Sequence, residues 1–359
     1  MKSTKIVFIV PSLADSHYKN RIVEFMDQGY EVEVLGFVRK DNKVVRALPY
    51  SYSCLGEVDD LNYSNRIPIY LKAFHKLSSQ YKNKDVCFFL GGLDIAMMFL
   101  MQNRKVRYIY EECDLMHTYT KIKYILEGVD KRIIKKSLIT ISTSEGFIHY
   151  HFGGNTPEQI CLVPNKLNPD ILKYTVLEKN TIDENHLNVG FVGVPRAHTD
   201  LLIETFCKTF PYHTFHLYGG PFPQNLEKLK KYENFIDHGF FKNPDDLPKI
   251  YSCLDLVLCT YDNRYINPQY AEPNKLYDSI YFETPIVVST NTFLSEKVKS
   301  LNIGYEVDPF DKKSIIEFFK SIKTNDIEEK IESCKKIDKK ELINRNDHFF
   351  NRLKGLLSQ

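Results

Sequence analysis

The chain has 359 residues, of which 43% are hydrophobic and 26% charged. This composition is typical of a soluble globular protein with room for two domains, and it excludes a disordered or fibrous chain. The formal net charge of +2 gives no overall field that favours nucleic acid.

The N-terminus, the length of the apolar runs and the cysteines indicate the cellular compartment. The first apolar run, KIVFIV, is too short for a signal peptide and reads as a buried strand. No apolar stretch approaches the roughly 20 residues that cross a bilayer. The eight cysteines are scattered and form no C-x-x-C pair. We therefore expect reduced, mostly buried thiols in a cytosolic protein.

Short apolar runs alternate with amphipathic segments along the first half. The predicted strands span residues 5–10, 31–38, 85–91, 106–112, 137–143 and 159–165, and helical patterns such as YKNRIVEFMDQG lie between most of them. Continuous apolar strands separated by helices predict a parallel sheet that is covered on both faces.

The alternation stops in a polar stretch without periodicity and then restarts. Residues 173–186 are predicted to be a linker. Beyond it, strands are expected at LNVGFVG, TFHLYGG, NFIDHGF, DLVLCTY, PIVVST and GYEVDP, followed by a strongly helical C-terminus. The sequence thus predicts two doubly wound α/β domains, at 1–172 and 187–340, with residues 341–359 as a C-terminal helix packing back on the first domain. Two such domains enclose a cleft, and ligands bind beyond the carboxyl ends of the strands.

Residues 271–289, AEPNKLYDSIYFETPIVVS, place charges at the entrance to an apolar helix. Pro273 suits a first helical turn, so a helix is expected from about Asn274 to Phe282. Its free N–H groups suit a phosphate. Lys275 adds a positive charge at the end where helix stability alone disfavours one. Asp278, one turn further on the same face, suits hydrogen bonds from vicinal hydroxyls. The alternative is an acidic cap with a chance Lys–Asp pair.

Glycines follow two predicted strands of the second half. Gly193 permits close approach of the backbone, and Arg196 in the same turn suits bidentate contact with a diphosphate before a helix from about Thr199. Gly219 and Gly220 form a similar turn, against which a nucleotide would lie. The alternatives are a tight turn with a surface arginine and a simple strand-end turn.

Acidic residues and a histidine follow the predicted strand 106–112. Glu111, Glu112, Asp114 and His117 suit binding of sugar hydroxyls or work as a base. The alternative is a helix cap with a surface histidine. The alternating histidines of HYHF (149–152) lack metal-ligand spacing, so ordinary helix-end residues and no metal site are expected.

The segment 119–139 mixes six basic residues with isoleucine and leucine. A basic amphipathic segment of this kind suits peripheral contact with anionic lipid. The alternative is a solvated helix face.

These motifs and their order along the chain resemble those of a known family. EPNKLYDSIYFETPIVVS is similar to the C-domain signature of the large retaining family of GT-B glycosyltransferases, which build capsule, exopolysaccharide and O-antigen. Four further segments follow in the same order as in that family, namely GFVGVPR, HLYGG, IDHGFF and EKVKSLNIGYEVDPFD. YIYEECDLMH, ITISTSEGFIHYHF and LVPNK are similar to its N-domain markers.

The resemblance implies roles at matching positions. Asp278 binds the ribose hydroxyls of a nucleotide-sugar and Lys275 contacts its phosphates. Glu272 holds the sugar hydroxyls, although it stands two residues later than the family's usual first acid, whose position holds Tyr270. The predicted donor-binding set is Gly193, Arg196, Gly219, Gly220, Glu272, Asn274, Lys275, Leu276 and Asp278. The predicted catalytic set is Glu112, Asp114 and His117.

The resemblance implies a cytosolic, bacterial hexosyltransferase with two Rossmann-like domains, an acceptor-side N-domain and a nucleotide-sugar-binding C-domain. It would move sugar from a UDP- or GDP-sugar to a glycan or lipid-linked acceptor, with retention, without a metal, cofactor or nucleic acid. Two alternatives stay open: a nucleotide-sugar epimerase, and a degenerate partner subunit that binds nucleotide without turnover. A nicotinamide dehydrogenase is disfavoured because neither first turn reads G-x-G-x-x-G.

Overall fold

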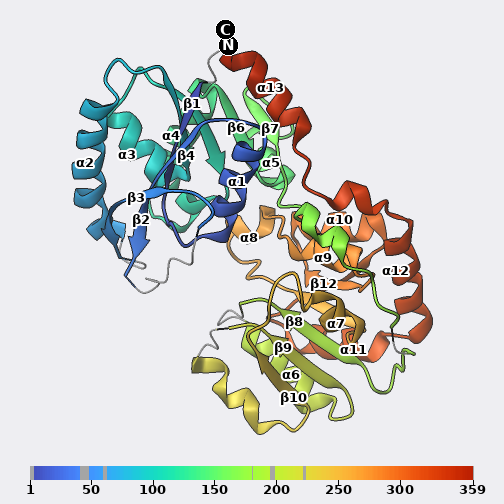
Figure 1. The fold of residues 1–359 in the computed structure, drawn as a ribbon. Helices are drawn as coiled ribbons and strands as arrows, with labels where there is room; N and C mark the ends of the chain where they lie inside the picture. The colour runs from blue at the N-terminus through green and yellow to red at the C-terminus, as the bar shows by residue number, and fades with distance from the viewer. Residues whose placement is uncertain are drawn as a thin grey trace. The chain divides into compact units, whose positions relative to one another are not determined.

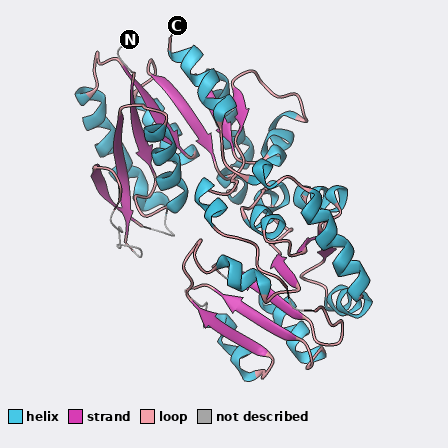
Figure 2. Ribbon diagram, turned by 45° about the vertical axis from the view of Figure 1, so that its right-hand side comes forward, coloured by secondary structure: helices cyan, strands magenta, loops and turns pink. Residues whose placement is uncertain are grey.

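A computed structural model describes residues 4–40, 48–59, 63–179, 181–194, 199–220 and 224–358. The chain divides into two compact units. Unit 1 comprises Met1–Val163 and Asn346–Gln359, and unit 2 comprises Pro164–Arg345. Each is an α/β unit with its own parallel sheet (Figures 1 and 2).

The sheet of unit 1 has seven parallel strands in the order β3-β2-β1-β4-β5-β6-β7. The strands are β1 Lys5–Val10, β2 Val32–Arg39, β3 Tyr52–Val58, β4 Val86–Gly91, β5 Arg107–Glu112, β6 Ile139–Ser142 and β7 Ile160–Leu162. The helices are α1 Ser16–Asp27, α2 Tyr63–Gln80, α3 Leu93–Gln102, the 3-10 helix η1 Met116–Tyr119, α4 Lys123–Lys136, α5 Glu145–Phe152 and α13 Asp347–Leu357.

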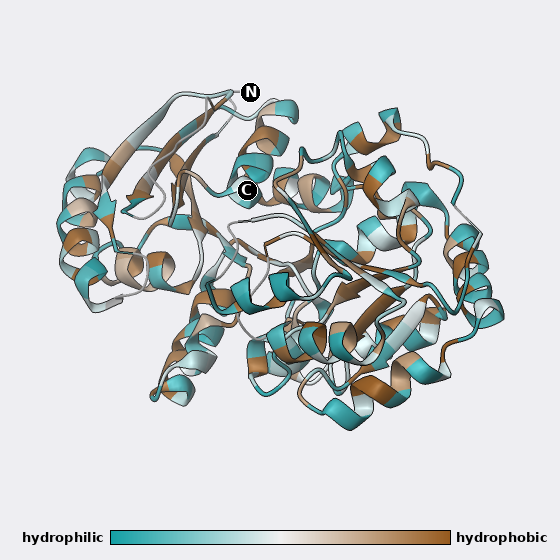
Figure 3. Ribbon diagram, turned by 90° about the horizontal axis from the view of Figure 1, so that it is seen from below, coloured by the Kyte–Doolittle hydropathy of each residue, from teal (hydrophilic) through white to brown (hydrophobic). Residues whose placement is uncertain are grey.

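Both faces of this sheet are covered, as the unbroken apolar strands predict. Val7 and Ile9 of β1 belong to one core, which α2 and α3 complete. Ile6 and Phe8 alternate with them and belong to a second core under α1 and α13. Figure 3, coloured by hydropathy, shows brown, hydrophobic stretches on the strands and helices that carry both brown and teal residues.

The six strands predicted in this half are confirmed, and a seventh, β3, was missed. Most of its residues are exposed because β3 is an edge strand that pairs only with β2. It therefore lacks the continuous apolar run that marks the inner strands.

Unit 2 has a six-stranded parallel sheet in the order β10-β9-β8-β11-β12-β13. Its strands are β8 Asn188–Val192, β9 Thr214–Tyr218, β10 Phe235–Gly239, β11 Leu256–Cys259, β12 Ile286–Ser289 and β13 Gly304–Val307, all six at predicted sites. The α-helices are α6 Asp200–Thr209, α7 Leu247–Ser252, α8 Ile266–Tyr270, α9 Lys275–Tyr281, α10 Phe293–Leu301, α11 Lys312–Ser321 and α12 Thr324–Lys336. The 3-10 helices are η2 Pro169–Lys173, η4 Gln224–Lys231 and η5 Lys339–Leu342.

Two cores sandwich this second sheet as well. Val257 and Cys259 of β11 pack in one core with α7, α9 and α10. Leu256 and Leu258 pack in the other with α6 and α11. The predicted doubly wound architecture is therefore present in both units.

The unit boundaries differ from the sequence-based division at 172/173 and 340/341. They fall at 163/164 and 345/346, because the segments just inside them pack on unit 2. Leu167 pairs with Ile343 in an isolated parallel bridge. Lys179, within the predicted linker, is partly buried and donates to the carbonyls of Tyr251 and Leu254 and to Thr284 Oγ1. The C-terminal helix α13 belongs to unit 1, where Phe349 and Phe350 contact the Phe25 ring.

All eight cysteines are free and five of them are buried, as predicted. Among the described residues, no helix combines the length and the apolar character needed to cross a bilayer.

Candidate functional site

The carboxyl edge of the unit 2 sheet has the strand order of a ligand-binding switch point. Neighbouring strands β8 and β11 lead to opposite halves of the sheet, since β9 and β10 lie on one side and β12 and β13 on the other. Ligands of open parallel sheets bind where the order reverses in this way. The turn after β8 and the segment after β11 therefore define the candidate site.

Lys275 lies at this switch point. It begins α9, within the predicted helix, and only 9% of it is exposed. Its Nζ lies 4.1 Å from the centroid of the Phe191 ring on β8 and 5.8 Å from that of Tyr261, which follows β11. The two aromatic faces hold a cation beside the strand ends. Neither ring is recognisable as part of the site from the sequence, because only folding brings them to α9.

Asp278 lies one turn deeper on α9 and is also buried. Burial raises the pKa of its carboxyl group to about 7, and the nearby Lys275 charge opposes this rise. Within the described part of the chain, no hydrogen bond reaches its carboxyl oxygens. The group can therefore accept hydrogen bonds from a ligand without breaking existing ones.

The predicted glycine turns lie beside these charges. Gly193 has φ +131°, and a Cβ there would lie 3.2 Å from Lys275 Cε and 3.3 Å from Nζ. Gly219 has φ +132°, and a Cβ there would collide with the Gly193 carbonyl oxygen at 2.0 Å. Gly220 packs beside the exposed Phe240 ring. The strand ends thus approach each other as only glycine allows. Arg196 lies outside the described residues.

The other residues of the motif have different surroundings. Glu272 is buried, accepts a hydrogen bond from Tyr277 Oη, and forms an ion pair with Lys297 at 2.6 Å. Both of its oxygens are thus engaged. Asn274 is exposed and its side chain makes no capping hydrogen bond. Leu276 is fully buried in the apolar core, so its side chain anchors α9.

In unit 1, the predicted acids at the end of β5 point to opposite faces of the sheet. Glu111 forms an ion pair with Arg21 at 2.9 Å, and this charge helps to lower the pKa of its carboxyl group to about 2 although burial opposes it. Glu112 turns to the other face, where its Oε1 lies 2.7 Å from His151 Nε2. Asp114 is exposed.

His117 is not on the surface, contrary to the alternative considered from the sequence. It is buried, with Nδ1 3.5 Å from Asp130 Oδ2. His149 is exposed as expected of a helix-end residue, but His151 is not an ordinary one, because it is buried beside Glu112. Sequence periodicity misses this cluster, because its members come from four separate elements.

A second polar group in unit 1 joins the first turn of α1 to the end of β5. His17 Nε2 lies 3.2 Å from Cys113 Sγ and 3.1 Å from Glu111 Oε1. Burial lowers the pKa of His17, but the contacts with Cys113 and Glu111 together raise it well above its usual value. The carboxyl ends of β1 and β5 lie at the same edge of the sheet with only β4 between them, which brings these residues together. His17 was not singled out from the sequence.

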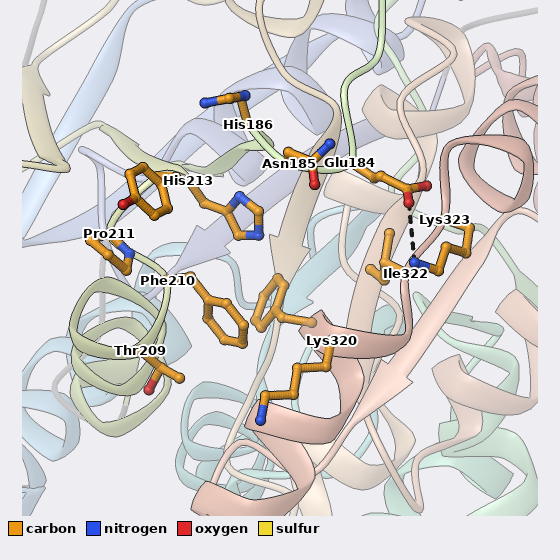
Figure 4. A pocket seen from close by; sticks show the side chains of 12 residues that line it. Glu184, Asn185, His186, Thr209, Phe210, Pro211, His213, Lys320, Ile322 and Lys323 are labelled. Carbon is orange, nitrogen blue, oxygen red and sulfur yellow. Dashed lines mark hydrogen bonds and ion pairs between the residues drawn. The ribbon is translucent and has the colours of Figure 1, made fainter.

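A separate pocket of about 520 Å³ lies at the amino end of the unit 2 sheet (Figure 4). Residues just before β8 and β9 line it, with the end of α11. Glu184 and Lys323 form an ion pair at its rim. The pocket is thus at the opposite edge from Lys275 and Asp278.

Comparisons with known proteins bear on the fold. No family model matches the sequence, and no curated protein matches it. HepE of Anabaena, solved with UDP and glucose, superposes with a TM-score of 0.70 at 12% identity, covering 98% of this chain and 100% of that one. Sucrose-phosphate synthase of Thermosynechococcus elongatus superposes with a TM-score of 0.70 at 13% identity, covering 99% of this chain and 98% of that one. WaaG, a glycosyltransferase of lipopolysaccharide biosynthesis, gives 0.61 at 14%, covering 98% of each.

The chain has the GT-B fold. The architecture expected from the sequence is thereby confirmed over nearly the whole chain. In the GT-B frame, unit 2 is the C-terminal Rossmann-like domain and its switch point carries Lys275 and Asp278.

Proposed function

We propose that this protein is a glycosyltransferase that takes sugar from a nucleotide-sugar and binds the nucleotide at the unit 2 switch point. The observation that carries the proposal is the pair of buried charges on α9, Lys275 and Asp278, beside the Gly193 turn. A buried ammonium group matches a diphosphate, and a carboxyl group without a bond from the described residues matches the two hydroxyls of a ribose.

The chemical task fits these groups. Breaking a sugar–phosphate bond leaves negative charge on the departing nucleoside diphosphate. A fixed cation in a site shielded from water stabilises that charge as it develops. Lys275 is already held between two aromatic faces, so little reorganisation is needed when the charge appears. We propose that Arg196 contributes a second positive charge to the diphosphate.

The donor is proposed to be a UDP- or GDP-hexose. The HepE structures solved with UDP or UDP-glucose support a nucleotide-sugar of this kind. We place the sugar hydroxyls at Glu272, which would exchange its bond from Tyr277 for one from the sugar. We propose that the residues of unit 1 that bind sugar hydroxyls or act as a base are Glu112, Asp114 and His117. Glu112 and His117 are buried, so this role requires local opening of the structure around them.

The acceptor is proposed to be a glycan or a lipid-linked sugar of a bacterial surface polysaccharide, with transfer that retains the anomeric configuration and needs no metal at the donor site. An exposed apolar group around the start of α4 supports peripheral contact with the inner face of the membrane. Its members are Met116, Tyr119, Ile122, Tyr124 and Ile125, and exposed Lys121, Arg132, Lys135 and Lys136 accompany them.

Nucleotide binding tests the site directly. We expect UDP or GDP to bind the full chain in calorimetry, and Lys275→Met to weaken binding at least tenfold, which is about 1.4 kcal/mol. Asp278→Asn should weaken binding of the nucleotide as well. Lys313→Met, at an exposed lysine on α11, is the matched control and should bind as the wild type does. Unchanged affinity in both α9 variants would refute the proposed site.

Turnover distinguishes the remaining enzymatic and non-enzymatic alternatives. Incubation of a UDP- or GDP-hexose with a lipid-linked sugar should give a product only when both are present. An epimeric nucleotide-sugar formed without acceptor would identify an epimerase. Tight nucleotide binding without transfer to any acceptor in a broad panel would identify a degenerate binding subunit.

A further inference from the structure

A buried cluster in unit 1 gathers four potential metal ligands from four elements. They are Glu112 at the end of β5, His117 in η1, Asp130 in α4 and His151 in α5. Their side chains are all nearly inaccessible, with at most 2% exposed. Two of them, Glu112 and His117, also belong to the catalytic set proposed above. A structural role is the alternative for these two buried residues, and it leaves the exposed Asp114 as the member of that set that reaches solvent.

Three ligand atoms already converge. One ligand atom from each of Glu112, Asp130 and His151 lies within 4.8 Å of the other two. The separations from His151 Nε2 are 2.7 Å to Glu112 Oε1 and 3.9 Å to Asp130 Oδ2. Ligands at zinc bond lengths on a tetrahedron are about 3.3 Å apart, which lies between these two values. Small side-chain rotations therefore suffice to surround one ion.

A hydroxyl group holds the outer oxygen of the Asp130 carboxylate. Tyr110 Oη donates to Asp130 Oδ1 at 2.9 Å, as second-shell partners do in metal sites. Ser142 Oγ lies 3.5 Å from Glu112 Oε2 but closer, at 3.1 Å, to the Ser144 carbonyl oxygen. Asp130 Oδ2 accepts no hydrogen bond from the described residues.

His117 supplies a second observation that points to a ligand. Its side chain is fully buried, yet neither ring nitrogen has a hydrogen-bond partner among the described residues. Nδ1 lies 3.5 Å from Asp130 Oδ2, and the ring stacks on His151 with 5.6 Å between centroids. A buried imidazole without partners is costly unless something binds it.

The chemical types of the four side chains indicate which ion fits. Carboxylate oxygens and imidazole nitrogens are ordinary ligands of divalent transition-metal ions. Two imidazoles with two carboxylates suit zinc, whereas magnesium and calcium prefer oxygen ligands alone.

We propose that Glu112, Asp130 and His151, with His117 as fourth ligand, bind one structural zinc ion within unit 1. The ion would tie β5, η1, α4 and α5 together and would release any proton held by His151 when it binds. This site lies in the interior of unit 1 and is separate from the donor site of unit 2, for which no metal is proposed.

Metal content of the full chain tests this site. Protein free of affinity tags is equilibrated with zinc sulfate, desalted and analysed by mass spectrometry of its metals. We expect about one zinc ion per chain, and its loss in His151→Gln and His117→Gln. His149→Gln is the matched control, because this neighbouring histidine is exposed, and it should retain the zinc. Wild-type protein that retains no zinc would refute the proposal, as would undiminished zinc in His151→Gln.

Cobalt substitution gives a readout that needs no variant. Cobalt bound at this site should show visible bands of a tetrahedral ion and no thiolate charge-transfer band, because the ligands are nitrogen and oxygen. A thiolate band would instead place the ion at His17, Glu111 and Cys113, the other group within ligand distance, and would overturn the assignment. Absence of any cobalt spectrum would overturn it too.

Discussion

Asp278 and Lys275 lie on one face of α9, and burial and the lysine charge have opposite effects on the pKa of Asp278. Burial favours the neutral form of the aspartate, whereas the lysine charge favours the ionised form. Burial prevails in the free protein, which leaves the carboxyl group half protonated near pH 7. A bound ribose would donate hydrogen bonds to the ionised form. We therefore infer that binding of the ribose favours release of the Asp278 proton.

The raised pKa of Asp278 predicts a pH dependence of stability. The folded protein keeps this proton up to about pH 7, whereas the unfolded chain releases it near pH 4. The free energy of unfolding should therefore fall as pH rises through this window, by ~4 kcal/mol at most. Asp278→Asn should remove that contribution, and urea titrations of both proteins between pH 4 and pH 8 measure the difference.

Other groups titrate in the same range, so the informative quantity is the difference between the two proteins. Asp311→Asn, at an exposed helix cap on α11, controls for the loss of an ordinary carboxylate. A stability difference between wild type and Asp278→Asn that stays constant with pH would contradict the assignment.

Lys275 and Asp278 were predicted from the sequence because helix geometry alone puts residues three apart on one face. Phe191, Tyr261 and His151 were not, since their importance arises from contacts between elements that are distant in the chain. His117 shows the same limit, because its residue type suggested chemistry while its burial depends on α4 and α5.

At the scale of elements, α4 combines two environments. Ile133 and Ile134 face the core of unit 1, whereas Tyr124 and Ile125 near the start of the helix are 76% and 68% exposed. Exposed aromatic and aliphatic residues beside lysines are unusual for a purely solvated helix face. This arrangement favours the membrane-contact interpretation of residues 119–139.

Vesicle binding tests this surface. The double variant Tyr124→Glu, Ile125→Glu should lose most of its flotation with vesicles containing phosphatidylglycerol, because it removes apolar area and adds negative charge. Ile67→Glu, Leu71→Glu is the matched control on exposed apolar residues of α2 and should still float. Equal flotation of both variants would contradict a specific contact through α4.

Strand prediction succeeded where a strand is buried on both faces and failed at β3. The inner strands carry continuous apolar runs, and such runs are hard to confuse with loops. Tyr52–Val58 instead mixes polar and exposed residues, and its pairing with β2 depends on register within the folded sheet. The edge of the sheet is thus the part that sequence pattern specifies least.

At the scale of the whole molecule, each unit has its own sheet and its own two cores. Calorimetric unfolding should therefore show two transitions. Nucleotide at about 100 times its Kd should stabilise unit 2 against unfolding by ~2.7 kcal/mol and leave the unit 1 transition temperature unchanged.

Phe349→Ala should lower the transition temperature of unit 1 only, since it removes a fully buried ring at a cost of about 3–5 kcal/mol in the free energy of unfolding.

Lys354→Ala, at an exposed position of the same helix, is the control for the Phe349 variant and should leave both transitions unchanged. A single transition that responds to both the nucleotide and the Phe349 change would show that the units unfold together.

The two-unit architecture was predictable because the α/β alternation restarts after residue 186, whereas the positions of the boundaries were not. Polar composition marked 173–186 as a linker, yet Lys179 within it makes three partly buried hydrogen bonds within unit 2. Composition reports average exposure, and a single long side chain can still dock a polar segment on a core.

The placement of α13 has a consequence for synthesis on the ribosome. Unit 2 is continuous in the chain and can complete its contacts as soon as it emerges, whereas unit 1 needs residues that are translated after all of unit 2. Until then the Phe25 side of its sheet lacks the cover of Phe349 and Phe350. The unit that starts first would therefore finish last, with an apolar face for chaperones to shield in the meantime.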